Sequence, residues 1–309
     1  HKDPAIRVAQ IGPGGENLVR YACITNELKH FNGRNGLGAV MGSKNLKAVV
    51  AKGSEFKIIP VNKKKFEKAK LKAIKYINRN DISGGTYRNF GTNANVNLNN
   101  AAGILPVRNF TGGSHGEAHK ISGETMADRF KTTFSTCKPC TILCGHKGNI
   151  AGETRQIPEY ETVGLLGSNL NIFDPVAISD FNEICTKMGM DTITAGGTIA
   201  WAMEATEKGL FKSNLKFGKV EGIAEVLHDI AYMKGIGADL AMGSRFCAKK
   251  YGGEDFAIQV KGMEMAAYDP RGAFGQALSY AVANRGACHL SSTAFVLEAY
   301  MDLIEAYSF

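Results

Sequence analysis

Long apolar runs are absent from this sequence of 309 residues. No stretch of about 18 uninterrupted apolar residues occurs, so the sequence predicts no membrane-spanning helix. The N-terminal residues, His1-Lys2-Asp3-Pro4, contain no apolar signal core, and we expect no secretory signal in this piece. Internal repeats and low-complexity tracts are also lacking. Hydrophobic residues make up 44% and charged residues 21%, which is the balance of a globular protein.

Recognised nucleic-acid-binding motifs are also missing, although the formal net charge is +8. The densest basic run starts at Lys63-Lys64-Lys65, extends to Lys75 and is interleaved with apolar residues such as Phe66 and Ile74. This pattern predicts an amphipathic helix with a solvated basic face. We expect no nucleic-acid contact, because no binding motif accompanies the run. A basic face also suits an acidic protein partner.

The cysteines do not have the pattern of a secreted, disulfide-stabilised protein. Their number is odd, the chain is long, and three of them are tightly clustered. Reduced thiols and a cytoplasmic location are therefore expected. The seven cysteines are Cys23, Cys137, Cys140, Cys144, Cys185, Cys247 and Cys288.

The clustered cysteines form a C-x2-C-x3-C run through Cys137, Cys140 and Cys144. Three thiolates at this spacing can hold one compact metal centre. A structural zinc site usually has a second pair of ligands, and His146 leaves a Cys3His zinc site open. Iron–sulfur clusters accept irregular spacing and a distant fourth cysteine. The spacing alone favours an iron–sulfur cluster over zinc, and zinc over three metal-free thiols.

Other polar candidates are weaker when each is taken alone. The glycine-rich segment from Gly33 to Gly38 could bring backbone amides close to an anion, but a tight structural turn is an equal reading. Strand alternation would place Glu159 and Glu161 on one face as a candidate acid or base. His289 is a second candidate, although a lone histidine is more often structural.

One further pair lies on a predicted helix. Glu225 and His228 are three residues apart, so both side chains can face one ion, although an exposed hydrogen-bonded pair is more common.

Hydrophobic periodicity predicts a small β region followed by a helical body. Strands are expected at 6–9 and 46–50, with a helix around 16–30 between them. Asp174-Pro175 is a typical helix start. The segment 83–115 is rich in Gly and Asn and is interpreted as an irregular connection. Further helices are predicted over roughly 191–208, 221–234, 237–251 and 294–307.

Five segments together resemble the aldehyde:ferredoxin oxidoreductase family. They occur in the family's order and span nearly the whole chain. The segments are Arg34–Val49, Cys137–Gly145, Pro158–Leu170, Met188–Gly209 and Asp269–Leu290.

This resemblance implies a mostly α fold: the helical second and third domains of the family, with a short β-containing remnant of the N-terminal domain. The expected divisions are 1–55 for the remnant of the pterin-cradling domain, 56–258 for the helical domain with the cysteine cluster, and 259–309 for the start of a third, helical domain.

The resemblance also implies cofactors and a reaction. The cofactors are a tungstopterin, with tungsten or molybdenum held by two pterins, and one [4Fe–4S] cluster. The reaction is oxidation of a small aldehyde to a carboxylic acid, with ferredoxin as the electron acceptor. The resemblance also implies that the protein is a homodimer. The alternative is a non-catalytic fragment or a zinc-stabilised helical module.

Roles carry over residue by residue from the matching motifs. The cluster ligands are Cys137, Cys140 and Cys144, and the fourth ligand is expected outside this chain. Glu161 matches the carboxylate near tungsten, with Glu159 as the fallback, and His289 matches the histidine that assists proton transfer.

Further roles concern the pterins and a second metal. The residues that approach the pterins are Arg34, Asn35, Gly36, Met190 and Asp191. The first Asp of the family's D-x-x-G-L-D motif is replaced here by Thr186. His228 and Glu225 match the pair that helps hold a metal between subunits, with Asp180 as a third contributor.

Overall fold

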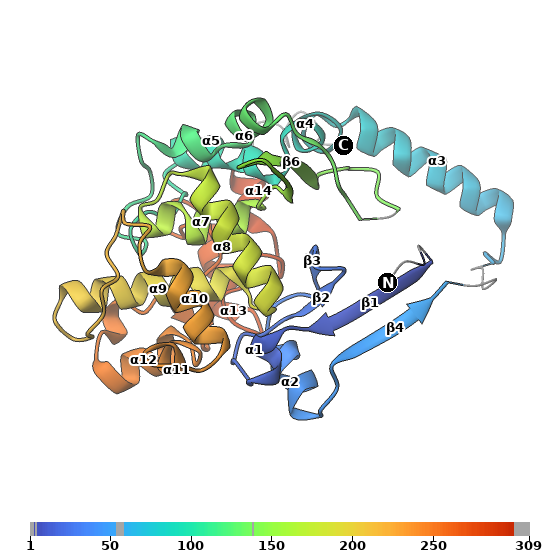
Figure 1. Cartoon of the computed structure of the whole chain (residues 1–309). Helices are drawn as coiled ribbons and strands as arrows, with labels where there is room; N and C mark the ends of the chain where they lie inside the picture. Colours follow the sequence, from blue (N-terminus) through green and yellow to red (C-terminus); the bar gives the residue numbers. More distant parts are fainter. Residues whose placement is uncertain (1–2, 4, 54–58, 138, 300–309) are drawn as a thin grey trace.

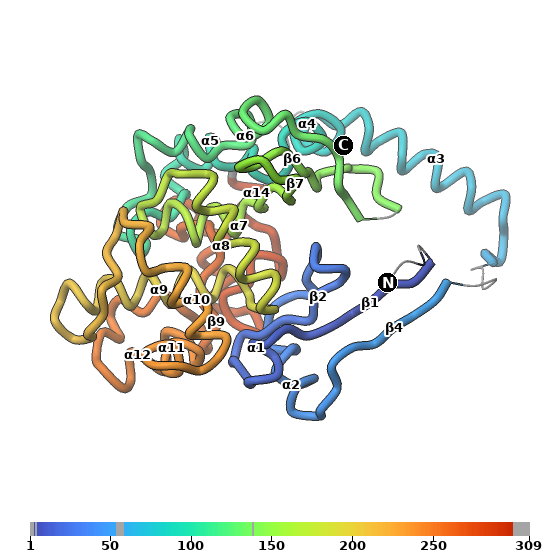
Figure 2. Tube along the Cα trace, in the orientation of Figure 1, coloured from blue at the N-terminus to red at the C-terminus, as the bar shows by residue number. Residues whose placement is uncertain are grey.

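The computed structural model describes residue 3 and residues 5–53, 59–137 and 139–299. A helical body fills one side of the molecule, and a small antiparallel sheet lies beside it (Figure 1). One long helix, α3 (Lys63–Arg79), extends away from that body, as the Cα trace also shows (Figure 2). The predicted mostly α fold with a short β-containing segment is confirmed.

The N-terminal sheet has the strand order β3-β2-β1-β4, and its neighbouring strands are antiparallel. The strands predicted at 6–9 and 46–50 are confirmed as β1 and β4. The helix predicted around 16–30 is wrong, because this segment turns back and pairs with β1. The sheet elements are β1 (Ile6–Ile11), α1 (Pro13–Glu16), β2 (Ile24–Asn26), β3 (His30–Phe31), α2 (Leu37–Ser43) and β4 (Ala48–Lys52).

The segment 59–157 combines short helices with a second sheet. The basic helix predicted from Lys63 is confirmed as α3, and Asn62 caps it by accepting a hydrogen bond from the Lys65 amide. The irregular connection predicted at 83–115 is only partly confirmed, because it contains α4 and α5. The elements after α3 are α4 (Tyr87–Phe90), α5 (Asn95–Ala101), α6 (Gly123–Phe130), β5 (Thr133–Phe134), β6 (His146–Ile150) and β7 (Glu153–Gln156).

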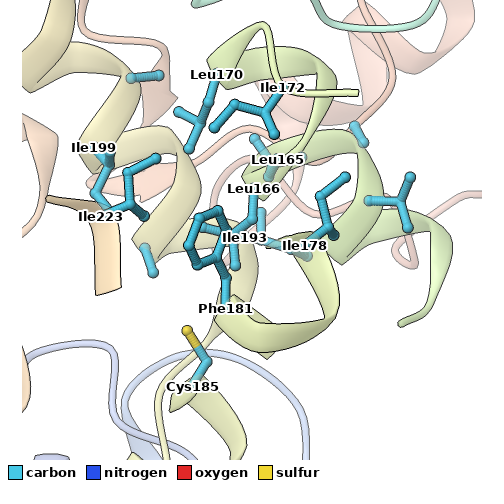
Figure 3. Close-up of a cluster of buried hydrophobic side chains, with 14 of the residues drawn as sticks. Leu165, Leu166, Leu170, Ile172, Ile178, Phe181, Cys185, Ile193, Ile199 and Ile223 are labelled. Carbon is cyan, nitrogen blue, oxygen red and sulfur yellow. The ribbon is translucent and has the colours of Figure 1, made fainter. Parts of the chain in front are cut away.

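The hydrophobic core lies among α7 (Tyr160–Leu166), α8 (Pro175–Met188) and α9 (Thr192–Glu207), which bury a cluster of aliphatic side chains around Phe181 (Figure 3). The helix start at Asp174-Pro175 is confirmed, since the Asp174 carboxylate accepts a hydrogen bond from the Val176 amide. A Cβ atom at Gly196 would lie 2.5 Å from the Leu165 carbonyl oxygen. Only glycine therefore permits this close approach of α7 and α9.

In the rest of the helical body, α10 packs against α8 and α11, whereas α11, α12 and β9 contact α9. The helix predicted over 237–251 is interrupted at Gly243, whose φ is +84°. Among the described residues, no helix is both long enough and apolar enough to cross a membrane. The elements are α10 (Ile223–Ala231), α11 (Gly237–Leu240), α12 (Ser244–Tyr251), β8 (Gln259–Val260), β9 (Met263–Glu264), α13 (Phe274–Val282) and α14 (Ala294–Ala299).

Candidate active site

A cavity of about 440 Å³ lies where the N-terminal sheet, the second sheet and the helical core meet. Its walls come from the β2–β3 hairpin, the segment before α7, the C-terminal half of α8 and the start of α9. Segments that are distant in the sequence therefore border one space. The polar groups in its lining include Lys29, His30, Arg34, His146, Glu159, Glu161, Glu183, Thr186, Lys187 and Asp191.

Glu161 lines this cavity and also contacts His289, which lies behind it. Glu161 lies in the first turn of α7, and its Oε1 is 3.5 Å from Nε2 of His289. Its Oε2 accepts a hydrogen bond of 2.9 Å from the Ala267 amide, which fixes the carboxylate. Glu161 Oε1 and His289 Nδ1 are buried without a hydrogen-bond partner among the described residues. Unpaired buried polar atoms of this kind call for an explanation, and a bound ligand is one.

Glu159 and Glu161 are not placed by strand alternation, because α7 begins at Tyr160 and Glu159 is its N-cap. Glu159 faces the cavity, and its side chain is exposed there. Desolvation by the surrounding protein raises the pKa of its carboxyl group, the nearby His30 opposes the rise, and the charge of Glu161 adds to it. A carboxyl group with a raised pKa beside a second carboxylate is a common arrangement at functional sites.

Arg34 and Asp191 form a buried ion pair on the cavity wall. Arg34 Nε donates to Asp191 Oδ2 at 2.7 Å, and the two side chains are 8% and 7% exposed. Asp191 is also the N-cap of α9, since its Oδ1 accepts from the Ile193 amide. Arg34 further donates to Thr194 Oγ1 and to the Glu264 carbonyl. The two predicted cofactor residues therefore bind each other.

A second cavity of about 210 Å³ lies on the other side of this pair, and Asp191 lines both spaces. Asn35 and Gly36 line the second cavity with φ values of +82° and +71°. Met190 is completely buried in the hydrophobic core. It belongs to the lining of neither of these two cavities.

The three clustered cysteines lie on the loop that joins β5 to β6. Cys137 is exposed, whereas Cys140 and Cys144 are half-buried. Backbone hydrogen bonds, first that from Leu143, lower the pKa of the Cys140 thiol. Burial, followed by the negative charges of Glu159 and of the other two thiols, raises the pKa of Cys144 to about 11. Cysteine thiolates are the ligands that iron–sulfur clusters use, and this loop carries three cysteines.

Among the residues that the structure describes, no group of three His, Cys, Asp or Glu side chains is placed to hold a single metal ion. His146, the candidate fourth zinc ligand, directs its Nε2 to the Arg88 carbonyl at 3.0 Å. Glu225 and His228 are both exposed on α10. Their role in holding a metal between subunits stays a prediction. Asp180 is paired with Arg155.

Two groups beside the ion pair have no motif in the sequence. Glu264 is 1% exposed, and its Oε1 accepts hydrogen bonds from the amide and the hydroxyl of Ser244. Burial raises the pKa of its carboxyl group, although Ser244 and Arg34 oppose the rise. Thr194 donates to Asp191 and accepts from Arg34. The only sequence signal for Thr194 is its place three residues after a capping Asp.

Comparison with known proteins identifies the family of this chain. Residues 68–307 match the family model for aldehyde ferredoxin oxidoreductase, domains 2 and 3, and residues 1–53 match the model for its N-terminal domain. These matches place the chain in a family of oxidoreductases. The chain belongs to the aldehyde ferredoxin oxidoreductase family.

Several relatives are similar over most of this chain. The tungsten-containing aldehyde ferredoxin oxidoreductase of Pyrococcus furiosus is 41% identical over 297 residues, which cover 93% of this chain and 49% of the relative. That of Thermococcus kodakarensis is 40% identical over 297 residues, with the same coverage. The aliphatic sulfonate oxidoreductase, WOR-like subunit, of Pyrococcus furiosus is 31% identical over 327 residues, 99% of this chain and 51% of the relative.

A solved structure has the same fold. The active site complex BamBC of benzoyl coenzyme A reductase superposes with a TM-score of 0.73 and 25% sequence identity, over 91% of this chain and 46% of that chain. The chain spans about half the length of the relatives it matches.

Proposed function

We propose that this chain is part of an enzyme that oxidises aldehydes to carboxylic acids and passes the electrons to ferredoxin. The observation that carries the proposal is the pair of Glu161 and His289. Their facing atoms are 3.5 Å apart, and each side chain has one buried atom without a hydrogen bond among the described residues. A carboxylate and an imidazole in this arrangement can accept and relay a proton. The family membership of the chain supports the reaction.

The chain offers side chains of the kinds that the family's cofactors need. The unpaired Oε1 of Glu161 in the first cavity and the backbone turn at Asn35 and Gly36 in the second support a polar ligand there. Arg34 and Asp191 would hold the tungstopterin, because both side chains line the first cavity. Cys137, Cys140 and Cys144 would hold the [4Fe–4S] cluster. When bound, these groups supply the two-electron oxidation and the onward electron transfer.

The protein's own groups manage the proton. The Ala267 amide fixes Glu161 Oε2 and leaves Oε1 directed at His289. Glu161 would accept the proton that a water molecule loses as it adds to the aldehyde carbonyl. His289 would then receive that proton through Nε2. Glu159, whose carboxyl pKa is raised by desolvation, would hold a second proton farther along the same cavity.

The test is aldehyde-dependent reduction of benzyl viologen by the metal-loaded protein, with one aliphatic and one aromatic aldehyde. Glu161→Gln keeps the size of the side chain and its acceptor for the Ala267 amide, but it cannot take up a proton. The rate should fall by about a hundredfold or more, the usual contribution of a general base. Glu221→Gln, at an exposed glutamate, is the matched control.

Iron and tungsten are measured in both variants, so that a lost cofactor is not mistaken for a lost proton acceptor. A Glu161→Gln variant with full metal content and the wild-type rate would overturn the role of Glu161. A wild-type protein that holds the metals and oxidises neither aldehyde would overturn the proposed reaction.

A further inference from the structure

Helix α3 carries a continuous basic face. Because an α-helix turns by about 100° per residue, six of its cations project within an arc of about 100°. Apolar residues such as Phe66, Ala73 and Ile77 project from the opposite side. No acidic residue lies within the basic arc. The six cations are Lys64, Lys65, Lys68, Lys72, Lys75 and Arg79.

These charges are free to act on a partner. All six side chains are exposed. Within the part of the chain that the structure describes, none of the six has a carboxylate at ion-pair distance, whereas Lys70, on another face of α3, pairs with Glu67 at 2.6 Å. Figure 1 shows that α3 extends away from the helical body. Six like charges on one face attract an acidic surface strongly at low ionic strength.

The C-terminal end of α3 is connected to the cysteine loop. Arg88 Nη2 donates to Asn78 Oδ1 on α3 and to the Thr141 carbonyl, which lies within the loop, at 2.5 and 2.7 Å. In the same loop the Cys137 thiol is exposed. A partner bound along α3 would therefore lie beside the loop that is expected to hold the electron-transfer centre.

We propose that the basic face of α3 docks a small acidic electron-carrier protein and places it against the cysteine loop. This inference rests on the proposed function. Oxidation of one aldehyde by water gives one carboxylic acid, two protons and two electrons. A carrier that takes one electron at a time must bind and leave twice for each aldehyde. Fast association through long-range attraction suits this traffic better than tight binding does.

The test compares two triple variants with the same change in net charge. Lys68→Glu/Lys72→Glu/Lys75→Glu reverses the centre of the basic face. Its control, Lys212→Glu/Lys216→Glu/Lys219→Glu, changes exposed lysines in the connection between α9 and α10, on the opposite side of the molecule in Figure 1. Far-UV circular dichroism checks that both variants keep the helix content of the wild type.

The readout is the kcat/KM for reduction of an acidic ferredoxin, with benzyl viologen as a small acceptor that needs no docking face. In the α3 variant the ferredoxin value should fall by roughly tenfold or more at low ionic strength. The difference in ferredoxin kcat/KM between the wild type and the α3 variant should largely vanish as the salt concentration rises from about 0.01 M to about 0.15 M, because salt screens the attraction. Viologen reduction should stay at the wild-type rate in both variants.

Three results would overturn the docking role: an unchanged ferredoxin rate in the α3 variant, an equal fall in the control, or an equal fall with viologen. If the wild type reduces neither acceptor, the proposed function fails and a direct titration decides the docking role. Ferredoxin binding must then be lost only in the α3 variant. Tighter binding of single-stranded DNA than of ferredoxin by the wild-type chain, lost in the α3 variant, would assign the face to nucleic acid.

Discussion

Replacing Asp191 by Asn should be strongly destabilising, because it removes the charge that compensates the buried guanidinium of Arg34. Both side chains are less than a tenth exposed. Asn keeps the Oδ1 that caps α9 through Ile193, and Asn and Asp cap helices about equally well. It loses the Oδ2 that accepts from Arg34 and Thr194. The variant therefore tests the charge with little change to the helix start.

The expected loss in the free energy of unfolding is about 3–5 kcal/mol, the usual cost of leaving one partner of a buried pair uncompensated. The lower part of this range is favoured, since the charge of Glu264 also acts on Arg34. Urea denaturation followed by circular dichroism and tryptophan fluorescence measures the loss. The sole tryptophan, Trp201, is buried on α9 and reports on the same core.

Asp128→Asn is the matched control. Asp128 pairs with Lys131 at 3.0 Å, but the two side chains are 87% and 80% exposed. An exposed pair of this kind contributes about 0–1 kcal/mol, so the control should stay close to the wild type. A loss for Asp191→Asn that is no larger than the control's would refute the reasoning. Adding Arg34→Met to Asp191→Asn should recover part of the loss, because the double variant no longer buries a guanidinium without its Asp191 partner.

Two further predictions concern the same region. Gly36→Ala should lower the free energy of unfolding by more than Gly103→Ala, as measured by urea denaturation. Both glycines have φ near +70°, which costs about 1–2 kcal/mol for Ala. Only at Gly36 would the new Cβ also meet a backbone atom, the Arg20 oxygen at 2.2 Å. Equal losses would contradict a clash. Glu264→Gln should remove a pH dependence of the free energy of unfolding. Burial raises the folded-state pKa of Glu264 above the ordinary 4.5. The stability that the protonated carboxyl group contributes is therefore present below pH 4.5 and is lost as the pH rises through the folded-state pKa. Denaturation of both proteins from pH 4.5 upward should show the wild type losing stability relative to the variant, and parallel curves would refute it.

The sequence predicts those elements that depend on local chemistry. Asp174 begins α8 because its carboxylate bonds an amide two residues away, and no distant partner is needed. The helix prediction for 16–30 was wrong because the structure of this segment depends on pairing with β1, in which Ala9 lies opposite Asn26. Positive φ values at Leu18 and Glu27 then break any helix there. Periodicity within a segment carries no information about such a partner.

The site residues divide in the same way, because local motifs indicate single residues but not their distant partners. Arg34 and Asp191 were both identified through motifs, but 157 residues separate them, and nothing in either motif indicates that they bind each other. The helical start at Tyr160 places Glu161 opposite His289, which the predicted strand alternation could not do. Glu264 belongs to no motif, and its burial beside Arg34 results from the packing of β9 against α9.

Asp191 borders both cavities, so a ligand in either one meets a wall that contains the same carboxylate. A ligand that drew Asp191 or Arg34 toward one space would change the shape and charge of the wall that faces the other. By linkage, each such ligand would then alter the affinity of the other by the same factor. The buried pair would in that case couple binding on its two sides.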